Sequence, residues 1–368
     1  MRLVLERRSE HSRLMAVLSP VIAIGLTVLV GAAIFALRGV DPLYGLYIYF
    51  IDPLTTLWSL EQLVVKATPL ILIGVGLAIC FSANVWNIGA EGQLTMGAIF
   101  GSMVPVLFTG WQSPLAIATM MVLGCLGGMA WAAIPAILKN RFGASEILTS
   151  LMLVYVAQLF LDWLVRGPWR DPMGFNFPKS VTFQGWHLMP TFGGTVHLGS
   201  LLAVVVVIIL AVVVGRTMTG FEVKVLGNAP RAGRFAGFSR RRMVILCFLL
   251  SGGLAGFAGL AEVTSTVGQL QPTISPGYGF TAIIVAFLGR LNPVGVLLAG
   301  LLLAVSYLGG EAAQITLGIS DKIARVFQGI LLFFVLACDT LILYRIRLEV
   351  AARAPYSAPH LAPREQRP

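Results

Sequence analysis

A short polar segment, residues 84–93, interrupts a stretch that is otherwise apolar from 67 to 138 and brings amides and a carboxylate into it. Polar backbone at membrane depth must be buried in protein or line a wet cavity. Two interpretations are open: a turn between two spans with a solvated Glu91, or a broken helix whose polar groups face a solute path. In the second, Asn87 would cap the next helix and Glu91 would suit its dipole. The candidate residues are Asn84, Trp86, Asn87, Glu91 and Gln93.

A second set of candidates lies later in the chain, between residues 262 and 295. Gln269 belongs to a polar segment that could line an entrance, and the glycines on either side of Tyr278 let the backbone bend into a span. The alternative is that these glycines and prolines only mark ordinary loops between spans. Glu262 and Asp339 lie near the ends of predicted spans, where an ionisable group is a functional candidate unless it reaches the membrane interface. The spans hold no chain of carboxylates, which disfavours a proton pump.

The connection 216–242 is strongly basic and predicts a short cytoplasmic helix. Asn228 is a plausible N-cap, Pro230 suits the first turn, and a helix of about ten residues would stop near Gly237. Such a helix either lies on anionic lipid or docks a partner protein, and charge alone favours lipid.

The sequence lacks the residue patterns that ATP hydrolysis, metal binding and disulfide formation require. None of the five lysines follows a glycine, so there is no phosphate-binding loop of the GxxxxGK[ST] type and this chain is not itself an ATPase of that class. The four histidines have no metal-ligand spacing, and the four cysteines lie in apolar runs without a CxxC. We therefore expect no catalytic residues, no metal site, no cofactor bound by this chain and no disulfide frame.

The candidate residues must be positioned by membrane helices. The chain has 368 residues, 57% of them hydrophobic and 11% charged, with a mean hydropathy of +0.86. Soluble domains carry about 25% charged residues, so a soluble enzyme or a nucleic-acid binder is excluded. A helix that crosses a bilayer needs roughly 20 apolar residues. The composition predicts an all-α polytopic membrane protein with about ten spans: 14–37, 62–82, 92–109, 115–138, 146–164, 197–215, 243–262, 278–290, 293–310 and 323–344.

Charge distribution orients these spans. With the N-terminus inside, nineteen of the 26 Lys and Arg residues fall on the inner side and seven on the outer side, which predicts that both termini are cytoplasmic. Small residues four apart, at Gly124 and Gly128 and at Gly252 and Gly256, predict close helix packing. The expected organisation is a cytoplasmic segment 1–13, a transmembrane domain 14–344 with an outer loop 165–196 and an inner loop 216–242, and a cytoplasmic tail 345–368.

Four segments, in order and at similar spacing, resemble one family. They are Asn87-Ile88-Gly89-Ala90-Glu91-Gly92-Gln93, Glu146 to Leu153, Leu226 to Ala232 with Phe235-Ala236-Gly237, and Pro276 to Thr281 with Gly289 to Pro293. Together they are similar to the membrane subunit of an ATP-binding-cassette (ABC) importer of the branched-chain amino acid/ribose/nucleoside permease family, in its basic-membrane-lipoprotein-associated branch. One departure is Val154, because many nucleoside-type members have Asn before the Tyr of the fifth span.

The resemblance implies a permease for a nucleoside or related sugar-containing solute in the bacterial plasma (inner) membrane. It replaces the lipid interpretation of the inner loop with a coupling helix that docks on a cytoplasmic ATPase, which would use the ATP. The other implied partners are a second permease subunit, identical or related, and a substrate-binding lipoprotein at loop 165–196, besides membrane lipid. The alternative function is an ion-coupled secondary transporter of a small polar solute. The implied coupling residues are Asn228, Pro230, Arg231, Ala232, Phe235 and Gly237.

Overall fold

The computed structural model describes residues 2–7, 13–320 and 322–349. Ten of its helices coincide with the ten predicted spans. They are α1 (Arg13–Leu37), α3 (Leu57–Ser82), α4 (Ala90–Leu107), α5 (Pro114–Phe142), α6 (Glu146–Arg166), α7 (Leu198–Arg216), α10 (Arg240–Ala261), α11 (Tyr278–Leu288), α12 (Pro293–Leu317) and α13 (Lys322–Leu343). Six of them, namely α3, α5, α6, α7, α12 and α10 with the π-helix η3 (Glu262–Val267) that continues it, are long and apolar enough to cross a membrane.

The structure also contains elements that the sequence did not indicate. Helix α2 (Pro42–Phe50) begins where Asp41 caps its first turn, and a 3₁₀ turn, η1 (Asp52–Leu54), follows it. The outer connection contains a second 3₁₀ turn, η2 (Gly185–His187). The chain is helical as expected, apart from one short pair of strands, in which β1 (Arg2–Arg7) pairs antiparallel with β2 (Tyr344–Glu349). Backbone pairing between chain ends cannot be read from local patterns.

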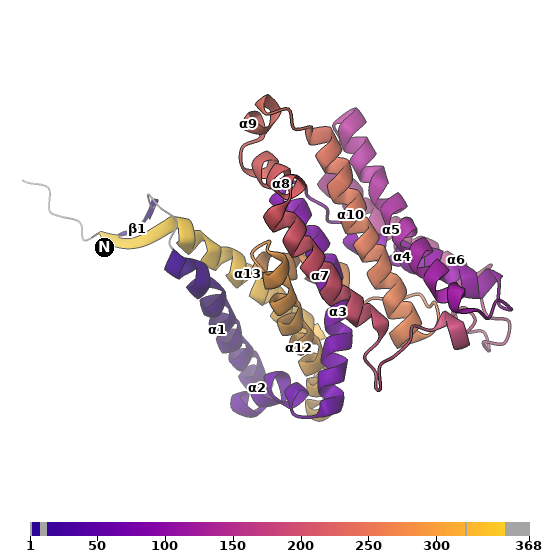
Figure 1. Cartoon of the computed structure of the whole chain (residues 1–368). Coiled ribbons are helices and arrows are strands. Elements are labelled where there is room, and N and C mark those ends of the chain that lie inside the picture. The colour runs from indigo at the N-terminus through magenta and orange to yellow at the C-terminus, as the bar shows by residue number, and fades with distance from the viewer. Residues whose placement is uncertain (1, 8–12, 321, 350–368) are drawn as a thin grey trace, which may run out of the picture.

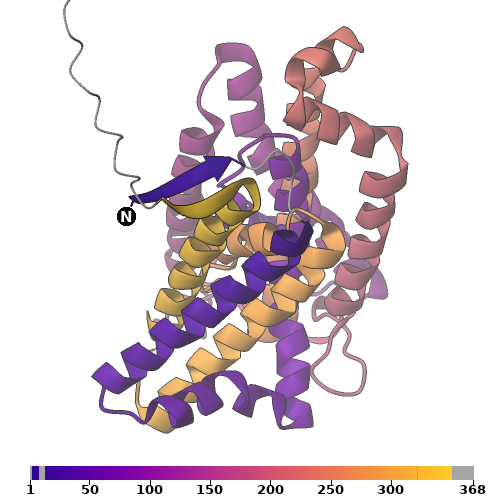
Figure 2. The same ribbon diagram turned by 90° about the vertical axis from the view of Figure 1, so that its left-hand side faces the viewer.

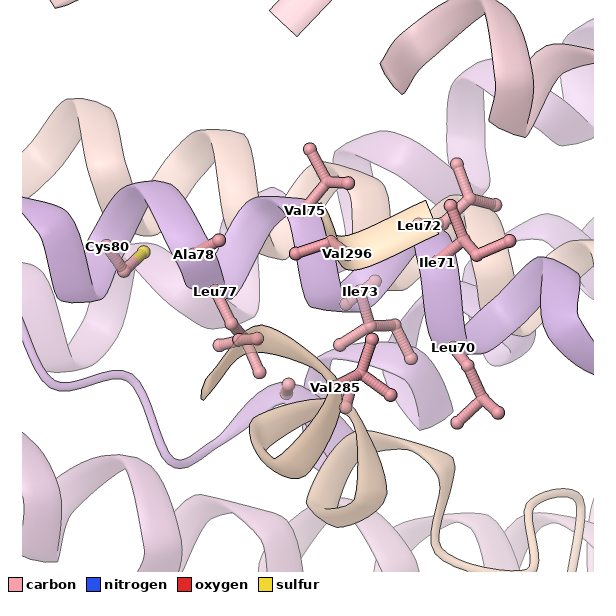
Figure 3. Close-up of a cluster of buried hydrophobic side chains, with 14 of the residues drawn as sticks. Leu70, Ile71, Leu72, Ile73, Val75, Leu77, Ala78, Cys80, Val285 and Val296 are labelled. Carbon is pink, nitrogen blue, oxygen red and sulfur yellow. The ribbon is translucent and has the colours of Figure 1, made fainter. Parts of the chain in front are cut away.

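Helix α3 lies at the centre of the bundle. In its most apolar stretch 89% of the residues are buried, compared with 28% in α6 and in α7. It packs against α7, α10, α11 and α12, and Figure 3 shows its side chains reaching Val285 of α11 and Val296 of α12. A stretch that is apolar on every side suits this position, because it is packed against other helices on nearly every face.

Helices α4, α5 and α10 form a tightly packed group beside this centre (Figure 1). A Cβ atom added to Gly256 of α10 would lie 2.3 Å from the carbonyl oxygen of Gly124 and 2.9 Å from the Cα of Gly128, both on α5. A Cβ atom added to Gly97 of α4 would lie 2.1 Å from the Cα of Gly256. The predicted small-residue contacts are therefore confirmed, and they are backbone to backbone.

The remaining helices define two edges and two ends of the bundle. Helix α13 packs against α1 and α2 against α12, and β1 and β2 lie together beside them (Figures 1 and 2). Helices α8 (Met218–Asn228) and α9 (Pro230–Phe235) project at one end, and the connection between α6 and α7 lies at the other (Figure 1). Helix α7 joins these two ends.

Candidate functional site

A cavity of about 310 Å³ opens at the end of the bundle that also holds the α6–α7 connection. One charged side chain comes from each of four elements: α3, α12, α13 and the π-helix η3. Residues 273–276, just before α11, also line the cavity. We call it the charged cavity. It is lined by Lys66, Glu262, Thr273, Ile274, Ser275, Pro276, Tyr278, Tyr307, Gly310, Glu311 and Arg325.

The lining of the charged cavity is balanced in charge. Two cationic side chains, Lys66 and Arg325, face two carboxylates, Glu262 and Glu311, so the formal charges cancel. Lys66 Nζ lies 2.8 Å from Glu311 Oε1 across 245 residues of sequence. A balanced set of donors and acceptors suits a neutral polar molecule better than an ion.

Two tyrosines add aromatic surface to the charged cavity. The rings of Tyr278 and Tyr307 meet edge to face, with their centroids 5.3 Å apart. The Tyr307 hydroxyl is 2.8 Å from Thr281 Oγ1, whereas the buried Tyr278 hydroxyl has no hydrogen-bond partner among the described residues. A buried hydroxyl without a partner costs about 1–3 kcal/mol, so a polar ligand at this point would be stabilised by satisfying it.

Glu91 lies next to this cavity and joins two helix N-termini. Its Oε2 accepts a hydrogen bond from the backbone N–H of Gly279, 2.6 Å away, in the first turn of α11. A Cβ atom at Gly279 would lie 2.3 Å from the Glu91 nitrogen, so only glycine permits this approach. Glu91 is 3% exposed, which makes the interpretation of a solvated turn residue wrong. The carboxylate suits the positive ends of α4 and α11.

Asn87 and Gln93 pair with each other inside the bundle. Asn87 Nδ2 donates to Gln93 Oε1 at 2.9 Å, and Gln93 Nε2 donates to Asn87 Oδ1 at 3.0 Å. Asn87 Nδ2 also donates to Ser251 Oγ of α10, at 3.2 Å. The expected cap is wrong, because Gly89 occupies the N-cap of α4 and Asn87 accepts the Gly89 N–H instead. The pair lines neither this cavity nor the one described next, and its place on a path stays a prediction.

The other predicted path residues lie elsewhere. Asn84 accepts a hydrogen bond from Trp86 Nε1 at 3.0 Å and lines a second cavity, of about 570 Å³, at the opposite end of the bundle. Gln269 accepts from Thr182 of the α6–α7 connection, at 3.3 Å. We call the second cavity the basic cavity, and it is lined by Phe81, Ser82, Asn84, Ala211, Val214, Gly215, Lys224, Gly227, Asn228, Arg290, Leu291, Asn292 and Pro293.

The predicted coupling residues project from the bundle on α8 and α9. The expectation of one ten-residue helix capped by Asn228 is wrong: Asn228 ends α8, Ala229 caps α9, and α9 has six residues starting at Pro230. Phe235 is 95% exposed, and Arg231, Ala232 and Arg234 lie at least partly at the surface.

Gly237 follows α9 with a φ of +85°, and no atom lies within 4 Å of the point that a Cβ atom would occupy, so the chain turns there in open space. Neither Phe235 nor Gly237 packs on the rest of the described chain, so both are accessible to a partner.

Sequence reasoning missed most of the charged cavity. Lys66 and Arg325 were counted only among the seven Lys and Arg residues predicted on the outer side. Glu311 and Tyr307 were not singled out. Their common feature is an ionisable or hydroxyl side chain near the end of an apolar helix, which could have marked them. Of the two ionisable residues weighed at span ends, Glu262 lines the cavity, and the side chain of Asp339 lies outside the described part of the chain.

Known proteins resemble this chain over most of its length. A family model described as branched-chain amino acid transport system / permease component matches residues 59–336. The glucose ABC transporter permease protein TsgB13 of Haloferax volcanii is 35% identical over 340 residues, covering 89% of each chain. The nucleoside ABC transporter permease protein NupB of Lactococcus lactis is 29% identical, covering 87% of this chain and 90% of NupB. The guanosine ABC transporter permease protein NupP of Bacillus subtilis is also 29% identical, covering 88% and 94%.

Proposed function

This chain belongs to the family of branched-chain amino acid transport system permease components, and on that premise we propose that it forms the path for a nucleoside or related sugar-containing solute in an ABC importer. It is a multi-pass transport subunit of the plasma (inner) membrane and not a catalytic enzyme. Its relatives act in ABC transporters, which disfavours the ion-coupled alternative.

The charged cavity supports a neutral, hydroxyl-rich solute. Its volume, about 310 Å³, falls at the small end of ligand pockets, which span roughly 300–1,000 Å³. Its four ionisable groups cancel in formal charge, and its tyrosines offer ring faces and one unpartnered hydroxyl. Nucleosides and sugars are uncharged and present several hydroxyl groups. The names of the relatives, which specify glucose, nucleosides and guanosine, agree with this class.

Transport by the complete system tests this function. The permease would be reconstituted in proteoliposomes with its ATPase, second permease subunit and binding protein, and uptake of labelled guanosine, adenosine and glucose would be compared. We expect uptake that requires ATP and is unaffected by ionophores. Uptake driven by an ion gradient without ATP, or no uptake of any of these solutes, would reject the proposal.

Removal of the Tyr278 hydroxyl has different expected effects on uptake, depending on whether the solute binds to it. We expect Tyr278→Phe to lower ATP-driven uptake about tenfold, because the solute loses a hydrogen bond to a desolvated group. If the hydroxyl has no ligand, its removal relieves an unsatisfied buried group, and the variant should be as stable and as active as the wild type. The measurements are initial uptake rate and thermal unfolding of the purified complex. Unchanged uptake would exclude Tyr278 from the path.

Glu91 should matter through its contact with α11. We expect Glu91→Gln to reduce uptake while leaving assembly intact, because the amide keeps the size of the side chain but loses the charge that faces two helix N-termini. Asp41→Asn is the matched control, since Asp41 also accepts a backbone N–H, from Leu43 at 2.8 Å, at a helix start that does not line the cavity. Equal uptake by both variants would argue against a role for Glu91.

The topology that accompanies this function has ten spans, both termini in the cytoplasm and α9 on the cytoplasmic side. Three observations support it: ten helices at the predicted positions, the excess of basic residues on one side, and the pairing of β1 with β2, which joins the two ends of the chain. Docking of the cytoplasmic ATPase on α9 is its direct test, because it requires that end of the bundle to face the cytoplasm.

The partners follow from the same proposal. An ABC importer needs an ATPase and a substrate-binding protein. We place the ATPase at Phe235 and its neighbours on α9 and the binding lipoprotein at the connection 165–196, whose Met173 and Phe175 are 84% and 93% exposed. A second permease subunit, identical or related, completes the path.

A further inference from the structure

The basic cavity carries chemistry that the path for a neutral solute does not use. Its charged lining residues are Lys224 of α8 and Arg290 of the turn between α11 and α12, and both are cationic. Asn84, Asn228 and Asn292 add amide groups around them. The cavity therefore brings two positive charges and several N–H donors to one place, which is the opposite of the balanced lining of the charged cavity.

The backbone around the basic cavity is unusual. Asn84, Arg290 and Leu291 have φ values of +54°, +54° and +55°, and they are three of the five non-glycine residues with positive φ in the described part of the chain. Asparagine tolerates this conformation, but arginine and leucine rarely adopt it. Strained residues of this kind concentrate at functional sites, where the surrounding structure holds them in place.

Hydrogen bonds hold this geometry. The backbone N–H groups of Arg290 and Leu291 donate to the carbonyls of Phe287 and Ala286, both at 2.9 Å. Arg290 Nη2 donates to Ser19 Oγ of α1 at 2.6 Å, which holds the guanidinium against α1. Hydrogen bonds thus hold the Arg290 side of the cavity in place, whereas the Lys224 side chain is exposed.

Close packing also connects the cavity to the proposed coupling segment, which consists of α8 and α9. A Cβ atom on Gly227 of α8 would contact the Ser82 carbonyl oxygen at the end of α3 at 1.9 Å, so the two backbones touch there. Lys224 lies about one helical turn before Gly227, so its ammonium is carried by the helix that leads directly into α9. An anion held between Lys224 and Arg290 would link α8 to the turn that ends α11.

We propose that the basic cavity binds a phosphate group, supplied either by a soluble phosphate or by the headgroup of an anionic phospholipid. Guanidinium and ammonium groups with amide donors are the usual partners of phosphate oxygens. Basic pockets between membrane helices on the cytoplasmic side also bind lipid headgroups. The bound phosphate bridges α8 and the α11–α12 turn and steadies the base of the coupling segment.

Binding to the assembled transporter tests this site without measuring uptake. The complete complex would be placed in nanodiscs of phosphatidylcholine, and binding of radiolabelled inorganic phosphate would be measured by equilibrium dialysis. In a second arm, phosphatidylglycerol that remains bound after purification from mixed lipid would be quantified by mass spectrometry. The variants are Lys224→Gln, Lys224→Glu and Lys224→Arg. Arg240→Gln is the matched control, because it removes another exposed cation of the connection 216–242 that does not line the cavity.

We expect Lys224→Gln to weaken binding about tenfold, Lys224→Glu to abolish it and Lys224→Arg to restore it, while Arg240→Gln has no effect. This pattern with inorganic phosphate identifies a soluble phosphate, and the same pattern with phosphatidylglycerol alone identifies the lipid headgroup. Absence of binding in both arms, or equal losses in Lys224→Gln and Arg240→Gln, overturns the proposal. Since solute transport is not the readout, these results are independent of whether the solute is a nucleoside.

Discussion

Phe235→Ala is expected to release the ATPase from the permease while leaving the permease fully folded. The Phe235 side chain is 95% exposed, so its removal costs no packing within this chain. In a complex with the ATPase, a buried aromatic anchor of this kind is worth about 2 kcal/mol or more, which corresponds to roughly 30-fold in affinity. The measurement is recovery of the ATPase with the purified permease at equal permease levels, together with ATP-driven uptake.

Gly237→Trp should give the same result by a different route. The tryptophan would occupy the docking surface, and a side chain at φ +85° also strains the backbone. Gly143→Trp separates these two effects. Gly143 ends α5 with a φ of +68°, and like Gly237 it has open space around its Cβ position, so a tryptophan there imposes similar strain outside the α9 segment.

The two interpretations of α9 predict different effects of these variants on ATPase recovery. If α9 only anchors the protein to lipid, an added tryptophan should be tolerated or should strengthen interfacial binding. Undiminished ATPase recovery and unchanged uptake in both Phe235→Ala and Gly237→Trp would therefore reject the coupling role. Equal loss in Gly237→Trp and Gly143→Trp would show that strain, and not docking, causes the defect.

Gly256→Ala is expected to destabilise the permease by about 2–3 kcal/mol, although it adds only one methyl group. The new Cβ would lie 2.3 Å from the Gly124 carbonyl oxygen and 2.9 Å from the Gly128 Cα, and backbone atoms on a packed helix cannot move aside as side chains do. Helices α5 and α10 would have to separate. Thermal unfolding of the purified protein and the yield of folded protein from membranes measure the effect.

Gly253→Ala is the control on the same helix. Its Cβ would meet the side chain of Met129, 3.0 Å from Cγ, and a flexible methionine can adjust. Both substitutions raise helix propensity equally, so the difference between them reports the backbone contact alone. Similar stabilities of the two variants would mean that α5 and α10 are not held by this close approach.

The path residues show where sequence reasoning stops. The polar segment around Asn87 was recognisable because amides interrupt an apolar run, and the buried position of Glu91 agrees with a break inside the bundle. The sequence could not separate its members. Asn87 and Gln93 satisfy each other, Glu91 contacts Gly279 across 188 residues, and Asn84 faces the opposite end of the bundle. Hydrogen-bond partners distant in sequence decide which polar group is available to meet a solute.

The boundary between α8 and α9 also shows a limit of prediction from sequence. Pro230 correctly indicated that a helix begins in the basic loop, because proline is suited to a first turn, whereas the expected cap at Asn228 is wrong. Asn228 instead ends α8, next to Gly227, which packs on the Ser82 carbonyl at the end of α3. This contact joins residues distant in sequence, so no local pattern records it.

The sequence by itself determined the membrane class, the positions of the ten apolar helices, the small-residue packing faces and the family, because length, hydropathy and motif order are local properties. Only the tertiary structure decided the two cavities. Lys66 meets Glu311, and Arg325 and Glu262 join them, from four different elements. Lys224 and Arg290 line one cavity at the seam between α8 and the α11–α12 turn. Charged side chains on separate helices form one site only when helix packing sets the angles between the helices and the depth of each residue in the bundle. No local sequence pattern records either quantity.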